Sequence, residues 1–300
     1  MKLAVILVNY NGKQYNEACI ESLLKQRGSH ETKIIIVDNG SQDDSMQIIQ
    51  ERFGTDDGIE TIFLDDNYGF SYANNVGIRR AKEWGADHVV LLNNDTEACE
   101  DLLTALLACA DRHPNSVIAP KIYYSDKRDV LWSAGGEVSP LVCKARHIGL
   151  DQKDTGQFDK ERRIGFATGC CLLLPRAVID KAGLLDERFF LYYEDTEYCL
   201  RLREMGIDIW YCPQARLYHK VGASSKGADS PLCAYYIARN WLLCNRLHLR
   251  GRYPVFLFYY AINRTVCCAL WLLRGKPALV RATWRGICDH GKRKYGRAEK

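Results

Sequence analysis

The 300-residue chain lacks every cysteine spacing that would indicate a zinc site or a disulfide framework. Its 13 cysteines are an odd number, no two of them form a CxxC pair, and most stand in apolar runs. Zinc sites and small disulfide-bonded domains need closely spaced pairs, so both classes are excluded. Free thiols in this number indicate a reducing compartment, and we expect a cytoplasmic protein.

The chain also lacks internal repeats, low-complexity tracts and any excess of its 23 glycines or 8 prolines. Repeat architectures and disordered proteins are therefore excluded. The apolar run at residues 3–8 ends at Asn9, which makes it too short for a secretory signal. We expect it to form the first buried strand. Apolar residues make up 47% of the chain, enough for a full core.

The net charge of +4 hides an asymmetry. Residues 246–300 carry 13 Lys/Arg and 2 Asp/Glu, whereas residues 1–245 have a net charge of −7. A basic end on an acidic body indicates an anionic partner, either a membrane surface or a nucleic acid. The basic residues alternate with apolar runs and match no base-reading motif, so we expect no nucleic-acid partner.

Strands and helices alternate along the first third of the chain. Apolar runs predict strands at residues 3–8, 33–37, 60–64 and 88–92, with helices at 16–26, 44–53 and 71–84 between them. This order predicts an α/β fold with a Rossmann-like, mostly parallel, doubly wound sheet.

The pattern changes after a predicted helix at 102–111. Strands are expected at 117–124, 164–174, 208–211 and 215–218, an irregular region at 125–160, and a helix at 232–250. We therefore expect one domain at 1–245, with halves at 1–112 and 113–245 and a mixed sheet in the second half. A helical C-terminal extension follows at 246–300.

Polar residues follow each of the four early strands, at Asn9, Asp38, Asn67 and Asp95. The carboxyl ends of parallel strands share one edge of a sheet, where ligands bind in such folds. Asp95 follows Asn93 and Asn94, and its carboxylate could hold a hard divalent cation against a phosphate. The alternative is that these three residues only form a turn and cap a helix starting near Glu97.

A second acidic cluster follows an aromatic-rich stretch at residues 189–193 and contains Glu194 and Asp195. A carboxylate framed by aromatic side chains is partly desolvated, which suits a general base. Alternatively, Asp195 is only a helix N-cap and Glu194 only a charge that favours the helix dipole. His219 lies between a predicted strand end and a Gly/Ser-containing segment, and it is either structural or a metal ligand shared with Asp95.

Eight stretches in this order carry a resemblance to a known family. They are Val8-Asn9-Tyr10-Asn11, Val37-Asp38-Asn39-Gly40-Ser41, Asn67-Tyr68-Gly69-Phe70, Asn74-Asn75-Val76-Gly77, Leu92-Asn93-Asn94-Asp95-Thr96, Gly169 to Arg176, Tyr193-Glu194-Asp195-Thr196-Glu197 and His219-Lys220-Val221-Gly222-Ala223-Ser224. Together they span residues 3–240. On these motifs the chain resembles family 2 glycosyltransferases with the GT-A fold, and within them the bacterial rhamnosyltransferase group.

The resemblance implies a role for each matching residue. The implied donor-binding residues are Asn9, Tyr10, Asp38, Asn67, Gly69, Asn75, Asn93 and Asn94. Asp95 and His219 would hold Mg²⁺ or Mn²⁺, and Asp195 would be the catalytic base beside Glu194. The family's DxD element reads Asn93-Asn94-Asp95 here, so only its last acid is present.

The expected activity is inverting transfer of a sugar from a nucleoside-diphosphate sugar, with dTDP-rhamnose the first candidate, to a polysaccharide or lipid-linked glycan acceptor. The alternatives are a nucleotidyltransferase and a non-catalytic sugar-nucleotide-binding module. A nucleotidyltransferase usually has a Gly-rich basic loop after its first strand, whereas residues 9–13 contain one glycine.

The C-terminal extension contains two apolar runs, at 254–262 and 266–273, separated by Asn263 and Arg264. An arginine at mid-span is costly in a bilayer, so the pattern favours an interfacial helix pair over a spanning helix. Trp271, Trp284 and the basic run at 292–294 suit an anionic lipid surface. We therefore expect a peripheral protein on the inner face of the cell membrane. The alternative is a helix that simply packs on the domain.

Overall fold

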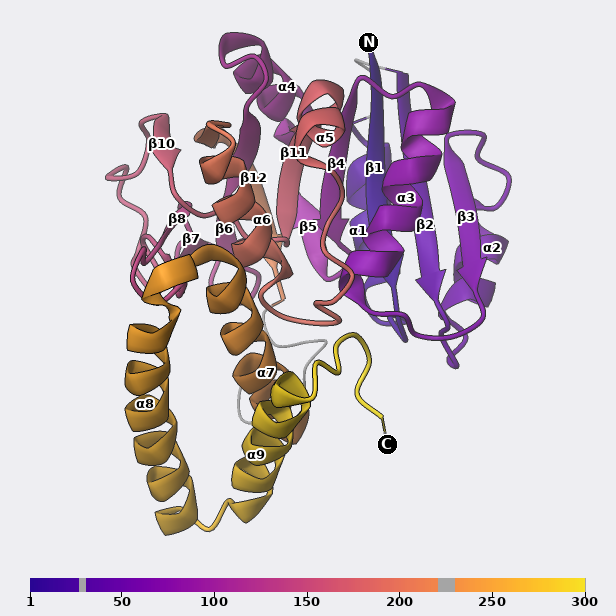
Figure 1. Cartoon of the computed structure of the whole chain (residues 1–300). Helices are drawn as coiled ribbons and strands as arrows, with labels where there is room; N and C mark the ends of the chain where they lie inside the picture. Colours follow the sequence, from indigo (N-terminus) through magenta and orange to yellow (C-terminus); the bar gives the residue numbers. More distant parts are fainter. Residues whose placement is uncertain (27–30, 221–229, 300) are drawn as a thin grey trace.

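The computed structural model describes residues 1–26, 31–220 and 230–299. Residues 221–224 of the motif that begins at His219 thus lie outside the described residues. The chain forms one large sheet with helices on both faces, and a group of C-terminal helices stands beyond one edge of that sheet (Figure 1).

The large sheet is mostly parallel, as expected. Its strands are β1 (Lys2–Asn9), β2 (Glu31–Asn39), β3 (Ile59–Leu64), β4 (His88–Asn93), β5 (Thr96–Ala98), β6 (Val117–Tyr124), β7 (Leu131–Ser133), β10 (Arg162–Ile164), β11 (Cys171–Pro175) and β12 (Ile209–His219). The main path runs β10-β12-β6-β11-β4-β1-β2-β3. Strand β11 is antiparallel to both β4 and β6, and β12 is parallel to β6. The strands β1 to β4, β6 and β12 therefore all end at the same edge.

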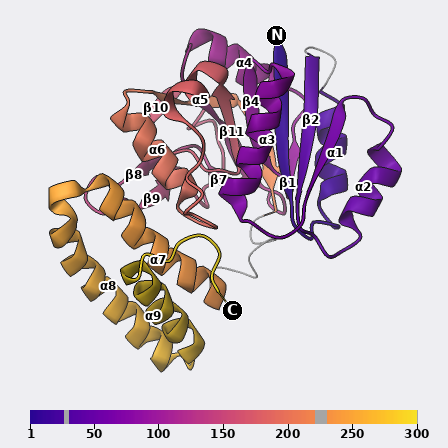
Figure 2. The same cartoon turned by 45° about the vertical axis from the view of Figure 1, so that its right-hand side comes forward.

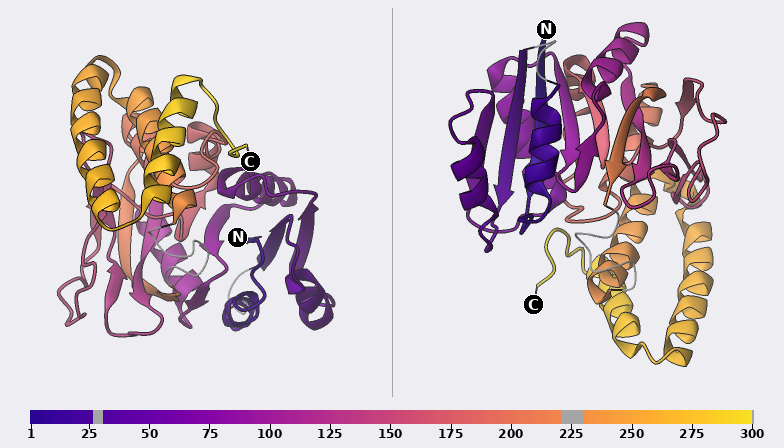
Figure 3. Two further views of the ribbon diagram at one scale, coloured as in Figure 1. Left: turned by 90° about the horizontal axis from the view of Figure 1, so that it is seen from below. Right: turned by 180° about the vertical axis from the view of Figure 1, so that it is seen from behind.

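Helices cover both faces, because the residues of each strand alternate between two hydrophobic clusters. The helices are α1 (Asn16–Leu24), α2 (Ser45–Phe53), α3 (Phe70–Trp84), α4 (Leu102–Arg112), α5 (Arg176–Ala182), α6 (Glu194–Glu204), α7 (Pro231–His248), α8 (Tyr253–Leu273) and α9 (Pro277–Gly291). On β1, Ala4 and Ile6 face the cluster with α3, whereas Leu3 and Val5 face the cluster with α1. Both faces are visible in Figures 1 and 3. This two-sided burial is what continuous apolar strands require.

The second half differs from the sequence expectation in three places. The strand predicted at 164–174 is two strands, β10 and β11, which pair with different neighbours. The strands predicted at 208–211 and 215–218 form one strand, β12, with an irregularity between Cys212 and Arg216. The region 125–160 contains β7, β8 (Gly136–Val138) and β9 (Ala145–His147). A strand of three residues is too short to show the alternation of apolar and polar side chains that identifies a strand. A long apolar run also looks the same in the sequence whether it forms one strand or two.

The C-terminal extension begins without a break in the chain. Helix α7 runs across the predicted division at residue 245, so that division stays a prediction. Helices α8 and α9 form an antiparallel pair beside α7, on the side of the sheet where the parallel strands end (Figure 1). The two apolar runs of the extension lie on one continuous helix, α8, so the prediction that residues 254–262 and 266–273 form a pair of helices is wrong. Asn263 and Arg264 are accommodated within the helix, because neither residue breaks helical hydrogen bonding.

Candidate functional site

Asn9, at the end of β1, is the centre of a hydrogen-bond network at the carboxyl edge of the sheet. Its Nδ2 donates to Asp38 Oδ1 at 2.9 Å, and to the Ser41 and Ser45 hydroxyls. Its Oδ1 accepts from Asn16 Nδ2 at 2.7 Å. Asn9 and Asp38 are buried, and this network fixes the Asp38 carboxylate at the strand end. Asn16 could not be predicted as a site residue, because a polar residue at a helix start carries no distinct signal in the sequence.

Tyr10 follows this network and projects from it, with 48% of its surface exposed. The exposed ring lies at the same edge as Asp38, because Asn9 and Asp38 are paired across β1 and β2. An exposed aromatic ring beside a fixed carboxylate can stack on a nucleotide base while the carboxylate binds its edge.

The loop after β3 is held by Asn39, a residue of the Val37–Ser41 stretch for which the sequence predicted no role. Asn39 Nδ2 donates to Asn67 Oδ1 at 3.1 Å, and Asn39 Oδ1 accepts from the Tyr68 amide. Gly69 has a φ of 91° and lies so close to Phe190 that a Cβ would stand 2.6 Å from its ring. The local structure therefore requires glycine at this position.

Asn75 braces the fold. It is buried on α3, its Nδ2 donates to the Leu185 carbonyl at 2.9 Å, and its Oδ1 accepts from the Leu185 amide at 3.0 Å. Glu187 accepts a further bond from the same amide group. These contacts tie α3 to the segment before α6, and a donor contact for Asn75 stays a prediction.

The chain turns back directly after β4, and this turn contains Asn93, Asn94 and Asp95. The short strand β5 that follows pairs with the end of β12, with Thr96 opposite His219. No helix begins near Glu97, because α4 starts only at Leu102. The helix-cap alternative for Asp95 is therefore wrong.

Asn94 joins this turn to the β1 network. Its Nδ2 donates to Asn16 Oδ1 at 2.6 Å, and Asn9 Oδ1 lies 3.4 Å away. A Cβ on Gly12 would stand 2.4 Å from Asn94 Nδ2, so only glycine leaves room for this contact. Asn93 is partly exposed at the end of β4, and its carbonyl accepts from the Thr96 hydroxyl.

The pairing of β5 with β12 brings Asp95 and His219 side by side. His219 Nε2 lies 3.3 Å from Asp95 Oδ1, and the two residues are 4% and 7% exposed. The Trp132 ring packs edge-on against the imidazole, and His219 Nδ1 has no hydrogen-bond partner among the described residues.

A carboxylate and an imidazole at this distance suit a divalent cation such as Mn²⁺. The pair fits a metal whose remaining ligands come from a substrate, since oxygen-rich phosphates complete such sites. In the described part of the chain, the one group of three Cys, His or acidic ligand atoms close together is Cys109, His113 and Glu161. There Glu161 is already bonded to Arg112 and His113, so this group needs no metal.

Glu194 and Asp195 open α6 at the same edge of the sheet. Asp195 lies inside the first helical turn and Tyr193 is the N-cap, so the N-cap alternative for Asp195 is wrong. Asp195 Oδ2 accepts from the Gly169 amide at 3.2 Å, and Oδ1 accepts from the Thr196 amide at 2.6 Å. These bonds hold the carboxylate between the first turn of α6 and the segment directly before β11.

Burial controls the protonation of this pair. Burial raises the pKa of Glu194 to about 8, and the negative charge of Asp195 adds to the shift. Burial also raises the pKa of Asp195, against the amides of Gly169 and Thr196 that favour its ionised form. Glu194 Oε2 has no hydrogen-bond partner among the described residues. Both carboxylates also lie in the first turn of α6, where a negative charge favours the helix dipole, so that alternative stays open. Buried carboxylates with raised pKa values are common at functional sites, and the catalytic role of the pair stays a prediction.

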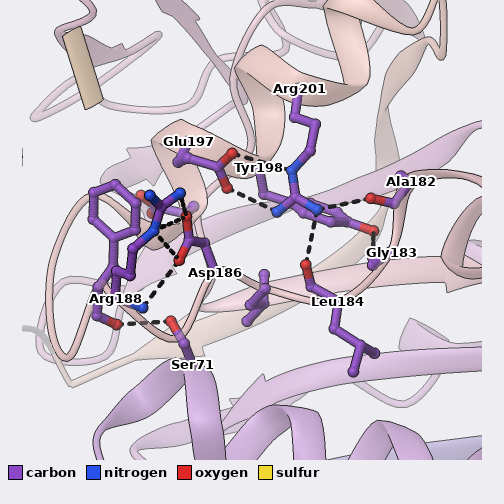
Figure 4. Close-up of polar contacts among 12 residues, drawn as sticks. Ser71, Ala182, Gly183, Leu184, Asp186, Arg188, Glu197, Tyr198 and Arg201 are labelled. Carbon is purple, nitrogen blue, oxygen red and sulfur yellow. Dashed lines mark hydrogen bonds and ion pairs between the residues drawn. The ribbon is translucent and has the colours of Figure 1, made fainter. Parts of the chain in front are cut away.

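The segment that leads into α6 is anchored on both sides (Figure 4). Arg201 forms an ion pair with Glu197 and donates to the carbonyls of Ala182 and Leu184, at 2.7 and 2.9 Å. The Ser71 hydroxyl of α3 donates to the Phe189 carbonyl at 2.8 Å. The loop between α5 and α6 is thus fixed at both ends, which fixes the position of Glu194 and Asp195.

The C-terminal segment after α9 lies along this edge (Figure 2). Arg297 forms an ion pair with Asp66, next to Asn67, and the Ala298 amide donates to the Tyr236 hydroxyl at 2.9 Å. The end of the described chain therefore forms part of the wall beside the loop after β3.

Comparison with known proteins agrees with this geometry. Residues 4–183 match the family described as "Glycosyl transferase family 2". A dTDP-rhamnosyl transferase, RfbF, of Shigella flexneri is 24% identical over 81% of this chain and 80% of its own length. An N-acetylglucosaminyl-diphospho-decaprenol L-rhamnosyltransferase of Mycobacterium tuberculosis is 25% identical over 92% of this chain and 91% of its own.

The fold is also that of solved GT-A structures. The mannosyltransferase PcManGT from Pyrobaculum calidifontis, in complex with GDP-Man and Mn²⁺, superimposes with a TM-score of 0.59. The match covers 97% of this chain and 86% of that one, at 12% sequence identity. At this identity the likeness concerns the fold alone.

Proposed function

Because the chain belongs to glycosyl transferase family 2 and is a glycosyltransferase with a nucleotide-sugar donor, we propose that it is an inverting, metal-dependent enzyme. Its acceptor is a hydroxyl of a cell-surface polysaccharide or lipid-linked glycan. Family membership also decides against the nucleotidyltransferase alternative. A non-catalytic binding module would have no use for a buried carboxylate pair with raised pKa values.

One observation carries this proposal: the dipeptide Gly169-Cys170 joins the two acidic groups. The Gly169 amide donates to Asp195, and the Cys170 carbonyl accepts from the Asn93 amide at 2.9 Å. The proposed base and the Asn93–Asp95 turn are therefore attached to two consecutive residues directly before β11. An inverting transfer needs this closeness, because base and leaving group act on opposite sides of one sugar carbon.

In the proposed reaction, Asp195 accepts the proton of the acceptor hydroxyl, and the hydroxyl oxygen bonds to the anomeric carbon. The bond between that carbon and the diphosphate oxygen breaks, and the nucleoside diphosphate leaves with the bonding electrons. One displacement from the opposite face inverts the anomeric configuration. Asp95 and His219 would hold the divalent cation, which neutralises the charge of the leaving diphosphate.

Asn9, Tyr10 and Asp38 bind the nucleoside in this proposal, and Asn67 and Asn93 border the sugar and diphosphate. The arrangement supports it, because the Asp38 carboxylate is held at the strand end beside the exposed Tyr10 ring. The rhamnosyltransferase relatives make dTDP-rhamnose the first donor to test.

The α8–α9 pair is proposed to attach the enzyme to an anionic membrane on its cytoplasmic side. In the described part of the chain, the helix at Arg250–Leu273 is long and apolar enough to cross a membrane, and only 11% of an apolar 18-residue stretch within it is buried. Its exposed apolar side chains include Val255, Phe258, Ile262, Val266, Leu270 and Leu273. Arg264 lies over the Trp241 and Tyr260 rings, so its charge faces the protein.

These contacts support attachment by one face of α8, with the basic residues of α9 and the C-terminal segment at the lipid headgroups. A lipid-linked acceptor would reach the site from the same surface. The relative that acts on a diphospho-decaprenol glycan has an acceptor of this class.

A donor panel tests the proposal. Thermal shift and calorimetry with dTDP-, UDP- and GDP-sugars, each with and without Mn²⁺, identify the nucleotide. Product formation is then measured with N-acetylglucosaminyl-diphospho-prenol as the first acceptor, and the anomeric configuration is read by NMR. A product with retained configuration, or metal-independent binding of every donor, would refute the mechanism.

A further inference from the structure

The turn that delivers Glu194 and Asp195 has an unfavourable backbone. Tyr192 has a φ of 67° and Tyr193 a φ of 75°, both in the left-handed region. Bulky residues rarely adopt this conformation, and two in succession need surrounding contacts that hold them. The residues that supply those contacts control where the two carboxylates stand.

Asn240 of α7 supplies the contacts to the main chain. Its Nδ2 donates to the carbonyls of Leu191 and Tyr192, both at 2.9 Å. Asn240 is fully buried and lies 45 residues beyond Asp195 in the sequence. One amide group therefore holds both peptide units on which the left-handed turn depends.

Arg239 fixes the orientation of this amide. Its Nε donates to Asn240 Oδ1 at 3.0 Å, so the Nδ2 group must face the turn. Arg239 is 1% exposed, and its Nη1 donates to the Tyr235 hydroxyl at 3.3 Å. Tyr235 in turn donates to Asp289 of α9 at 2.8 Å. A continuous chain of contacts thus runs from α9 through α7 to the turn before the catalytic carboxylates.

We propose that Asn240, oriented by Arg239, is a positioning residue that holds the Tyr192–Tyr193 turn and so aims Asp195 at the acceptor hydroxyl. This inference rests on the proposed role of Asp195 as the base. Asn240 has no contact with Asn9, Asp38 or Asp95 among the described hydrogen bonds, so its loss leaves nucleotide binding intact. The rate of the chemical step depends on it, because small misplacements of a base are costly.

Asn240→Ser tests the proposal, and Asn245→Ser is its matched control. Asn245 lies on the same helix, is equally buried, and donates only to the Trp241 carbonyl of its own helix. The two variants therefore lose the same side-chain volume, but only Asn240→Ser loses the hydrogen bonds that hold the Tyr192–Tyr193 turn. Both variants are assayed with dTDP-rhamnose as donor and N-acetylglucosaminyl-diphospho-prenol as acceptor. The temperature is one at which circular dichroism shows that both variants are folded.

We expect kcat to fall about 100-fold in Asn240→Ser, while the donor KM stays within about twofold. The acid limb of the kcat–pH profile should also move, because the surroundings of the carboxylate pair change. Asn245→Ser should keep both kcat and the pH profile. Equal kcat values in the two serine variants, or a loss confined to donor KM, would overturn the proposal.

Two further variants decide the question if Asn240→Ser does not fold. Asn240→Asp keeps the size and the Arg239 contact but cannot donate to the turn, and we expect the same fall in kcat. Tyr235→Phe removes one hydroxyl from the chain of contacts and should lower kcat without changing donor KM; an unchanged kcat would contradict the role of Arg239. If wild-type protein forms no product or Asp195→Asn remains active, the proposed function fails, which is distinct from failure of the Asn240 role.

Discussion

His219 Nε2 lies 3.3 Å from Asp95 Oδ1, although 123 residues separate them in the chain. The contact exists because β5 folds back after Asp95 and pairs with the last residues of β12. The main chain reinforces it, since the Lys220 amide donates to the Asp95 carbonyl at 2.9 Å. Two ligand types suited to one cation are therefore held together by strand pairing.

Asp95→Ala should abolish metal-dependent nucleotide binding. The variant removes the carboxylate of the proposed metal pair, and the imidazole of His219 alone holds a cation weakly. Calorimetry with dTDP and Mn²⁺ measures the loss. Asp101→Ala, at the start of α4 and without a side-chain cap bond, is the control and should bind as wild type. Unchanged affinity in Asp95→Ala would remove Asp95 from the metal site.

Asp195→Asn should retain donor binding and lose transfer by about 100-fold or more, because a positioned general base contributes that much. The amide keeps the size of the carboxylate and can still accept from the Gly169 amide. Steady-state kinetics and donor calorimetry separate the two effects. Near-normal turnover would exclude Asp195 as the base.

Glu194→Gln should stabilise the protein more at pH 8 than at pH 5. Burial raises the pKa of Glu194 to about 8, with Asp195 adding to the shift. The folded state then binds more protons than the unfolded state between the ordinary glutamate pKa and about 8, so stability falls as pH rises through that window. Glutamine removes this dependence. Melting temperatures at both pH values check the sign, and an equal change at both would contradict it.

Full-length protein should float with anionic liposomes, and Phe258→Glu combined with Ile262→Glu should not. Both side chains are exposed on α8, 72% and 52% respectively, and a charge there opposes burial in lipid. Phe63→Glu, at a phenylalanine on β3 that is 61% exposed, is the control and should still float. Alkaline carbonate should release the bound protein, because attachment is peripheral. Flotation of the double variant would refute attachment through α8.

The first half of the sheet and most of the edge residues could be predicted from sequence. Strands buried on both faces appear in the sequence as apolar runs. Asn9 and Asp38 each follow such a run directly, and Asp95 follows one after two asparagines. These are local signals. The second half was predicted less well, because β10, β11 and the two parts of β12 are defined by their partners rather than by their own pattern.

The amino-acid sequence alone determined the alternating α/β order, the single acid of the Asn93–Asp95 turn and the acidic pair that begins α6. Only the tertiary structure decided that β5 carries Asp95 to His219, that Gly169-Cys170 links the turn to Asp195, and that Asn240 holds the strained turn. The reason is physical: the features that the sequence determined depend on residues that are neighbours in the chain. The second depends on contacts between residues 26 to 124 positions apart, which form only when the sheet is assembled.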